Sequence, residues 1–263
     1  MNIYVMVDIE GISGIYTREQ VLPYEGMRFA EGRRYMTDEV NVCVSTLKSA
    51  GADKVYVYDC HGNSSTVIWE ELTKEADYYI CGSHDGGRMP GLEECDAVVL
   101  LGYHAMAGTK GAVLEHTFSS MGIQNLYLNG EKVGEIGIDA AIAGEKGKKV
   151  LLVSGDDKAC AEAKRLLPDV VTCEVKRGMN SYGAMMLPRE KAHQLLSEKI
   201  VMAMKNASKV KPLQVNKPVV IRAEQVERTA LPNPLKVNGL EILDGRSFQV
   251  TADTVEEAFY KVF

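Results

Sequence analysis

The sequence predicts an α/β fold, in which a mostly parallel sheet carries helices on both faces and a smaller C-terminal α/β lobe follows. Two observations indicate this class. Short apolar runs alternate with segments of helical periodicity along most of the chain, and several of these runs end in polar residues. Because parallel strands need long crossover connections, usually helices, this alternation is typical of a parallel sheet.

A strand opens the chain, because the run from Ile3 to Val7 is continuously apolar. Such a run is typical of a central strand that is covered on both faces. Asp8 and Glu10 follow at once, and their spacing of two places both carboxylates on one side if the strand geometry continues. Two anions at a buried strand end repel each other and lose hydration unless a cation or a proton lies between them. This strand end is therefore a candidate cation site.

The next elements continue the pattern of strand, loop and helix. A helix is predicted over residues 28–49, where apolar residues recur three or four positions apart and Gly51 can serve as the C-cap. Residues 54–58 are rich in β-forming side chains and predict a second strand, which runs into His61. Residues 64–75 then predict a further helix.

A strong strand is predicted at residues 97–103, after a short one at residues 78–81. The strong strand ends at His104. The following stretch, residues 106–122, is irregular and rich in small residues, and it contains His116.

A β-hairpin is predicted over residues 125–133, because Asn129 and Gly130 suit the positive φ angles of a type I′ turn. Its outgoing arm delivers Glu135. Alternation then resumes with a helix at 138–145, a strand at 150–154, a helix at 157–167 and a strand at 170–175.

The pattern changes after Lys176, so we expect a single domain over residues 1–263 with two sub-lobes, 1–176 and 177–263. The second sub-lobe is predicted to contain an irregular stretch at 179–187, a helix at 189–207, a polar connector at 208–218, strands at 219–224 and 247–251, and a last helix from Thr254.

Composition excludes several classes of function. The net charge is −6, with no block of basic residues, so neither nucleic acid nor an anionic membrane is an expected partner. No apolar run approaches the roughly 18 residues that a membrane span needs. The start of the chain lacks the features of a signal peptide, and the six cysteines are scattered without a C-x-x-C pair. We therefore expect a cytoplasmic protein with reduced thiols.

Four metal-ligating side chains follow three of the predicted strands: Asp8, Glu10, His61 and His104. The carboxyl ends of parallel strands share one edge of a sheet, where ligands bind in open α/β folds, so these side chains should converge. Glu135 is a candidate fifth ligand. Mixed carboxylates and imidazoles suit zinc, manganese, iron or cobalt better than calcium or magnesium. The set exceeds what one tetrahedral ion needs and suits two ions that share a carboxylate.

Ordinary structural roles compete with this interpretation. A single aspartate at a strand end usually caps a turn, and a single histidine there is usually a satisfied core or rim residue. Asp59 illustrates the choice, because it either orients the His61 imidazole or caps the next turn. The convergence of several such residues favours the metal site.

The sequence resembles the zinc-dependent D-aminopeptidases encoded with bacterial dipeptide transporters, and the similarity runs along the whole chain. The motifs that carry it are DIEGISG at 8–14, DCH at 59–61, LGYHA at 101–105, EH at 115–116 and NGEKVGEIG at 129–137. One departure is Cys60, where the family often has serine. On a strand its thiol should face away from His61.

The resemblance implies a two-zinc site in each subunit. Asp8 would bridge both ions, Glu10 and His61 would complete one, and His104 and Glu135 would complete the other. It also implies that His116 is the catalytic residue, proposed in that family as a nucleophile. The implied substrates are short peptides with a free N-terminus, such as those beginning with D-alanine, and the implied assembly is a ring-shaped homo-oligomer with a decamer as a candidate size.

These expectations describe a metal-dependent aminopeptidase, and two other classes compete with it. A dinuclear phosphoesterase could use the same ligands, but it usually needs basic groups for the phosphate, and no lysine or arginine stands beside these ligands in the sequence. A non-catalytic metal- or peptide-binding protein would leave His116 without a role.

Overall fold

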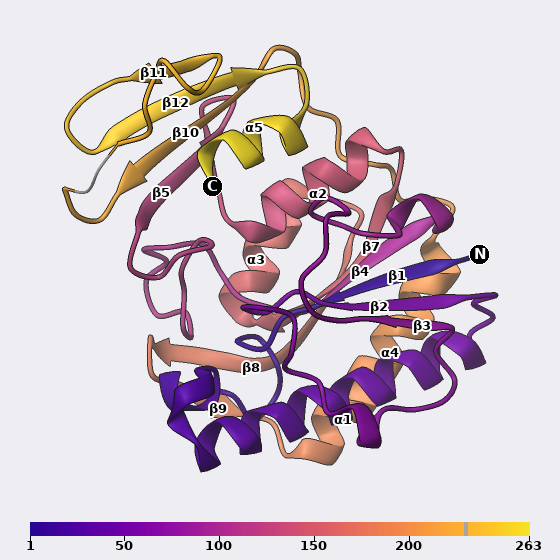
Figure 1. Cartoon of the computed structure of the whole chain (residues 1–263). Helices are drawn as coiled ribbons and strands as arrows, with labels where there is room; N and C mark the ends of the chain where they lie inside the picture. The colour runs from indigo at the N-terminus through magenta and orange to yellow at the C-terminus, as the bar shows by residue number, and fades with distance from the viewer. Residues whose placement is uncertain (229–230) are drawn as a thin grey trace.

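The opening apolar run forms an interior strand of a seven-stranded sheet, sheet A (Figure 1). In the computed structural model, which describes residues 1–228 and 231–263, β1 (Ile3–Val7) pairs in parallel with β2 (Val55–Asp59) on one side and β4 (Ala97–Tyr103) on the other. Every residue of these three strands is buried, as strands covered on both faces require.

Four more strands extend sheet A in the order β3-β2-β1-β4-β7-β8-β9. The last strand runs antiparallel to its neighbour, whereas the other pairs are parallel. The predicted mostly parallel sheet is thus confirmed. The added strands are β3 (Tyr78–Ile80), β7 (Lys149–Asp156), β8 (Val171–Asn180) and β9 (Gly183–Met186).

Helices cover both faces of sheet A (Figure 1), as predicted. Alternate residues of β1 point to opposite faces, so that Val5 joins the core under α1 and α4, whereas Met6 joins the core under α2 and α3. Within the described ranges, no helix is both long and apolar enough to cross a membrane. The bounds are α1 (Met27–Ser49), α2 (Glu135–Glu145), α3 (Asp157–Leu166) and α4 (Arg189–Asn206).

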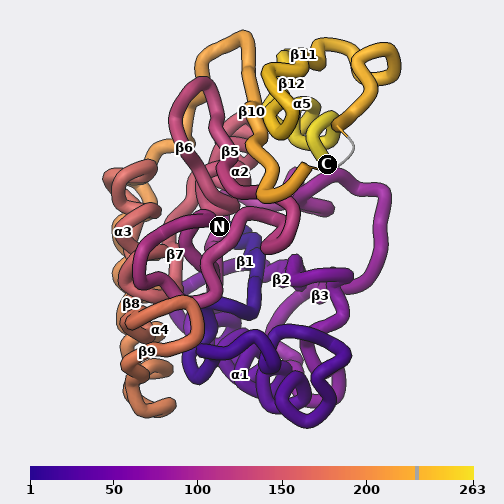
Figure 2. Tube along the Cα trace, turned by 90° about the vertical axis from the view of Figure 1, so that its left-hand side faces the viewer, coloured from indigo at the N-terminus to yellow at the C-terminus, as the bar shows by residue number. Residues whose placement is uncertain are grey.

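A second, antiparallel sheet of five strands, sheet B, lies at one end of the molecule (Figure 2). Its order is β11-β12-β10-β5-β6, and helix α5 packs between it and α2. The elements are β5 (Ile123–Leu128), β6 (Glu131–Val133), β10 (Val219–Gln225), β11 (Leu240–Ile242), β12 (Ser247–Ala252) and α5 (Val255–Val262).

The predicted division at residue 176 does not follow the sheets. The hairpin β5–β6 lies before residue 176, yet it pairs with β10 and completes sheet B. In the other direction, β9 and α4 lie beyond residue 176 but belong to the layers of sheet A. The prediction of an irregular stretch at 179–187 is wrong, because this stretch holds the end of β8 and all of β9.

The helix predicted over residues 64–75 is wrong, since the segment holds only a single 3₁₀ turn at Trp69–Glu71. A side chain from the preceding strand explains the difference. The carboxylate of Asp59 accepts hydrogen bonds from the backbone N–H groups of Thr66 and Val67, at 2.5 and 3.0 Å. Those N–H groups face the carboxylate instead of a helical hydrogen-bond ladder.

A buried lysine fixes the segment that follows β1. Lys176, on β8, donates three hydrogen bonds from Nζ to the backbone carbonyls of Glu10, Ile12 and Ile15, at 2.5, 2.8 and 2.7 Å. In the same segment, Ser13 donates from both its backbone N–H and its hydroxyl to the buried carboxylate of Glu39. The backbone around Glu10 is therefore tied to β8 and α1.

Candidate metal centre

The predicted ligands lie at the carboxyl edge of sheet A, where the chain reverses its direction of travel across the sheet. From β1 the chain proceeds to β2 and β3 on one side, and it then returns to β4 on the other side of β1. Such a reversal opens a crevice between adjacent strand ends, which is the usual ligand site of open α/β sheets. Asp8, His61 and His104 follow the ends of β1, β2 and β4, respectively.

The carboxylate of Asp8 lies between two imidazoles. Its Oδ1 is 3.1 Å from His61 Nδ1, and its Oδ2 is 3.4 Å from His104 Nε2. Each imidazole faces one more carboxylate: His61 Nδ1 lies 3.3 Å from Glu10 Oε2, and His104 Nε2 lies 3.2 Å from Glu135 Oε1. The arrangement has two halves that share Asp8.

Backbone carbonyls determine which nitrogen of each histidine carries the proton. His61 donates from Nε2 to the carbonyl of Val21, at 2.9 Å, and His104 donates from Nδ1 to that of Ala105, at 3.0 Å. A carbonyl oxygen can only accept, so in the neutral rings the nitrogens that face the carboxylates carry free lone pairs. This is the usual way in which metal-binding imidazoles are oriented.

Unsatisfied polar atoms indicate that these groups fit a metal. Within the described part of the chain, Glu10 Oε2 and His104 Nε2 are buried and have no hydrogen-bond partner. Such atoms are expensive to bury unless something binds them. Asp8, Glu10 and His104 offer ligand atoms within 4.8 Å of one another, and so do His104, His116 and Glu135. The nitrogen and oxygen donors match those that zinc takes in proteins.

The pKa values of these carboxylates and imidazoles are shifted in opposite directions. Burial would raise the pKa of Asp8, but its contacts with the imidazoles of His104 and His61 outweigh burial and hold that pKa well below its usual range. Burial would also raise the pKa of Glu135, but the interaction with His104 lowers it to about 2. Conversely, the carboxylates raise the pKa of both His61 and His104 well above the usual value, although burial alone would lower it. The imidazoles thus hold protons where a metal would bind.

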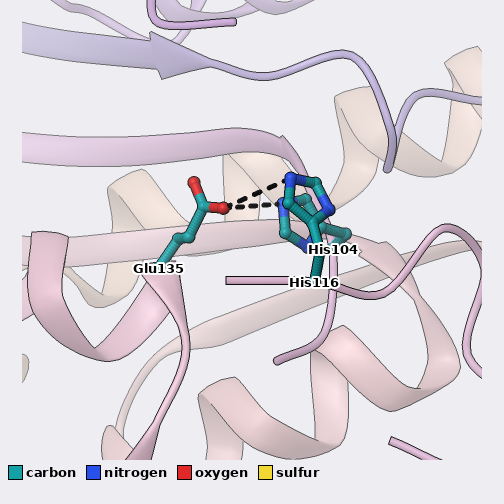
Figure 3. A group of neighbouring side chains, drawn as sticks. All are labelled: His104, His116 and Glu135. Atoms are coloured by element: carbon teal, nitrogen blue, oxygen red, sulfur yellow. Dashed lines mark ion pairs between the residues drawn. The ribbon is translucent and has the colours of Figure 1, made fainter. Parts of the chain in front are cut away.

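His116 lies against this centre without belonging to a strand (Figure 3). Its ring stacks on that of His104, with centroids 4.0 Å apart and planes 12° apart, and its Nε2 lies 3.6 Å from Glu135 Oε1. His116 also donates from Nδ1 to the carbonyl of Leu114. Its Nε2 therefore carries a free lone pair in the neutral ring.

Glu135 is the first residue of α2, whereas the sequence predicts it on the outgoing arm of the hairpin, before a helix that begins at Ile138. The earlier helix start matters for the site. Glu135 Oε1 accepts a hydrogen bond from the backbone N–H of Phe118, at 2.8 Å, which ties the loop of His116 to this carboxylate. A carboxylate in the first turn of a helix also interacts favourably with the helix dipole.

Arg88 is a site residue that sequence reasoning missed. It binds Asp139 on α2 with two hydrogen bonds, from Nε at 2.9 Å and from Nη2 at 3.0 Å, and its Nη2 lies 3.9 Å from Glu135 Oε2. Tyr103 donates a third hydrogen bond to Asp139. No basic residue stands beside the ligands in the sequence, but the fold brings Arg88 close to Glu135. The bidentate pair with Asp139 nevertheless neutralises most of the charge of Arg88.

The structure shows which groups the side chains of Asp59 and Cys60 contact. Asp59 caps the segment after His61 through backbone N–H groups, and its contact with His61 is to the backbone N–H at 3.3 Å, not to the ring. The thiol of Cys60 donates to the carbonyl of Val7, at 3.2 Å.

A cavity of about 760 Å³ opens over the centre. Five of the six predicted site residues line it, and Arg88 also contributes. The lining residues from the predicted site are Asp8, Glu10, His61, His116 and Glu135.

Comparison with known proteins identifies the family. The family model described as D-aminopeptidase matches residues 1–263. The chain belongs to the D-aminopeptidase family. A D-aminopeptidase of Bacillus subtilis (strain 168) is 37% identical over 215 residues, which are 81% of this chain and 77% of that protein. This family assignment makes the chain a peptide hydrolase.

A solved D-aminopeptidase has the same fold. It is the Zn-dependent D-aminopeptidase DppA from Bacillus subtilis, described as a self-compartmentalizing protease. The TM-score is 0.91 at 33% identity, covering 99% of this chain and 95% of that one. The dependence of that enzyme on zinc agrees with the donor set found here.

The metal-free protein is expected to lose stability relative to the zinc-loaded protein as the pH rises above about 6.5. Because the pKa values of His61 and His104 are raised in the folded chain, their protons stabilise it fully below about pH 6.5, and this contribution is lost as the pH rises through the raised values. Zinc needs deprotonated imidazoles, so its contribution changes in the opposite direction. The measurement is the Tm of the chelator-treated and of the zinc-loaded protein at several pH values. A change of 1 kcal/mol in the free energy of unfolding shifts Tm by about 2–4 °C. If Tm depends on pH in the same way with and without zinc, the assignment of His61 and His104 as metal ligands is wrong.

Proposed function

We propose that this chain is a metal-dependent aminopeptidase that removes the N-terminal residue, a D-amino acid such as D-alanine, from short peptides at a dinuclear zinc centre. The observation that carries the proposal is the sharing of Asp8 between two histidine–carboxylate pairs. A single ion would use only part of this donor set. One catalytic domain spanning residues 1–263 would hold it.

The proposed ligands divide as the contacts do. Asp8 would bind both ions, Glu10 and His61 would hold one, and His104 and Glu135 would hold the other. Manganese, cobalt or iron could occupy the same donors. When bound, the two ions would polarise the scissile carbonyl and lower the pKa of a water molecule toward neutrality.

His116 is the proposed catalytic residue. Its Nδ1–H is held by the carbonyl of Leu114, so Nε2 is the atom that can take up a proton or deliver it to the leaving amine. The stacked ring of His104 limits the orientations of the His116 ring. The resemblance implies direct attack by this nitrogen as the alternative role.

The proposed setting is a cytoplasmic, ring-shaped homo-oligomer, with a decamer as the candidate size. The six cysteines are free thiols, which supports a reducing compartment. The description of the solved DppA enzyme as self-compartmentalizing supports an assembly that encloses its active sites. Enclosure would restrict access to short peptides.

A panel of aminoacyl amides tests the reaction. We expect the zinc-loaded protein to hydrolyse D-alanine amide at least tenfold faster than L-alanine amide, a difference of about 1.4 kcal/mol in activation free energy. Chelation should abolish this activity, and added zinc should restore it, while a generic phosphate ester should remain intact. Hydrolysis of the phosphate ester, or metal binding without cleavage of any amide, would support the competing classes instead.

Replacement of His116 tests its role. His116→Ala should lower turnover by about 10²–10⁴-fold, as for a general acid or base, while elemental analysis still finds the zinc content of the wild-type protein. His193→Ala, on α4 away from the centre, is the matched control and should keep both properties. If His116→Ala instead loses zinc, His116 is a ligand and the proposed division of roles is wrong.

A further inference from the structure

A buried carboxylate on α3 joins two segments that each carry a proposed ligand. Glu162 is 6% exposed, and none of the roles above uses it. Its Oε2 accepts a hydrogen bond from the backbone N–H of Met106, at 2.8 Å, and its Oε1 accepts one from that of Gly134, at 3.1 Å. Met106 lies two residues after His104, and Gly134 lies immediately before Glu135.

We propose that Glu162 is the positioning residue of the half-centre formed by His104 and Glu135. The inference rests on the proposed metal centre. The two ligands come from distant parts of the sequence, one after β4 and the other at the start of α2. The Glu162 carboxylate connects them through one hydrogen bond to each backbone, so it sets the separation between the two side chains.

The packing around Gly134 leaves little freedom for another arrangement. A Cβ atom at Gly134 would lie 2.7 Å from Met106 Cβ and 2.8 Å from Glu162 Oε1. The two segments therefore touch each other at the carboxylate. A displacement of either segment would break a hydrogen bond of Glu162 and would also move a ligand.

The chemistry of this position requires a carboxylate. Both partners are N–H donors, and an ionised carboxylate offers an acceptor oxygen to each. A glutamine of the same shape offers one acceptor and one NH₂ group, which would face the second N–H as donor against donor. Glu162→Gln thus keeps the volume of the side chain, removes one hydrogen bond and pushes one segment away.

The other half of the centre is held by different residues. Lys176 and Glu39 fix the segment that contains Glu10, through the carbonyls of Glu10, Ile12 and Ile15 and the N–H of Ser13. Loss of the Glu162 contacts should leave that segment in place. The effect of Glu162→Gln is therefore expected to fall on one zinc ion more than on the other.

Zinc affinity, measured by titration of the metal-free protein against a chromophoric chelator, tests this inference. In Glu162→Gln, one of the two binding events should weaken about tenfold or more, the range found when a partner of a metal ligand is removed, while the other stays within about twofold. Tm of the metal-free variant should fall by only a few degrees, the effect of one lost buried hydrogen bond. Glu131→Gln, an exposed change of equal charge on the neighbouring hairpin, should alter neither event.

Two results would overturn the inference: unchanged affinity for both ions, or an equal weakening of both. The wild-type arm separates these from failure of the proposed function. A wild-type protein that binds two zinc ions but cleaves no D-alanine amide contradicts the proposed reaction alone. A wild-type protein that binds one ion contradicts the dinuclear centre, and Glu162→Gln must then weaken that ion tenfold for the inference to stand.

Discussion

The contact on which the centre depends is that of one buried carboxylate with two imidazoles. Asp8 is 4% exposed, and each of its oxygens faces a different histidine. This arrangement is possible because Asp8 ends the central strand, while His61 and His104 follow the strands on either side of it. A buried anion with this surrounding needs positive charge, from protons or from metal ions. The rest of the site is arranged around that requirement.

The orientation of the ligands is set by residues that are not ligands. Backbone carbonyls hold the far nitrogens of all three histidines, so the near nitrogens face the carboxylates. Lys176 and Glu162 each hold one of the ligand-bearing backbone segments. In the proposed centre, zinc would replace protons on ligands that these contacts already hold in place.

The sequence predicted the features that depend on local pattern. Continuous apolar runs identified the buried strands, and polar residues at their ends identified Asp8, Glu10, His61 and His104 as neighbours, because parallel strands end at one edge. Glu135 was predicted as a ligand but placed just outside its helix. The Asn129-Gly130 hairpin formed as expected, with φ angles of 49° and 86°. Each of these signals lies within a few residues of the feature that it predicts.

What the sequence did not predict depends on partners far along the chain. The segment after His61 is not helical because Asp59 captures its N–H groups, and β5 and β6 leave the first sheet because β10 pairs with them. Arg88 binds Asp139 on α2 and comes within 3.9 Å of Glu135, although it lies far from both in the sequence. No spacing or composition rule encodes such contacts.

Crystals of the zinc-loaded protein, measured at wavelengths on both sides of the zinc absorption edge, test the central claim most directly. We expect two anomalous peaks in each subunit, both within bonding distance of Asp8, one beside Glu10 and His61 and the other beside His104 and Glu135. A single peak, or two peaks that do not share Asp8, would contradict it.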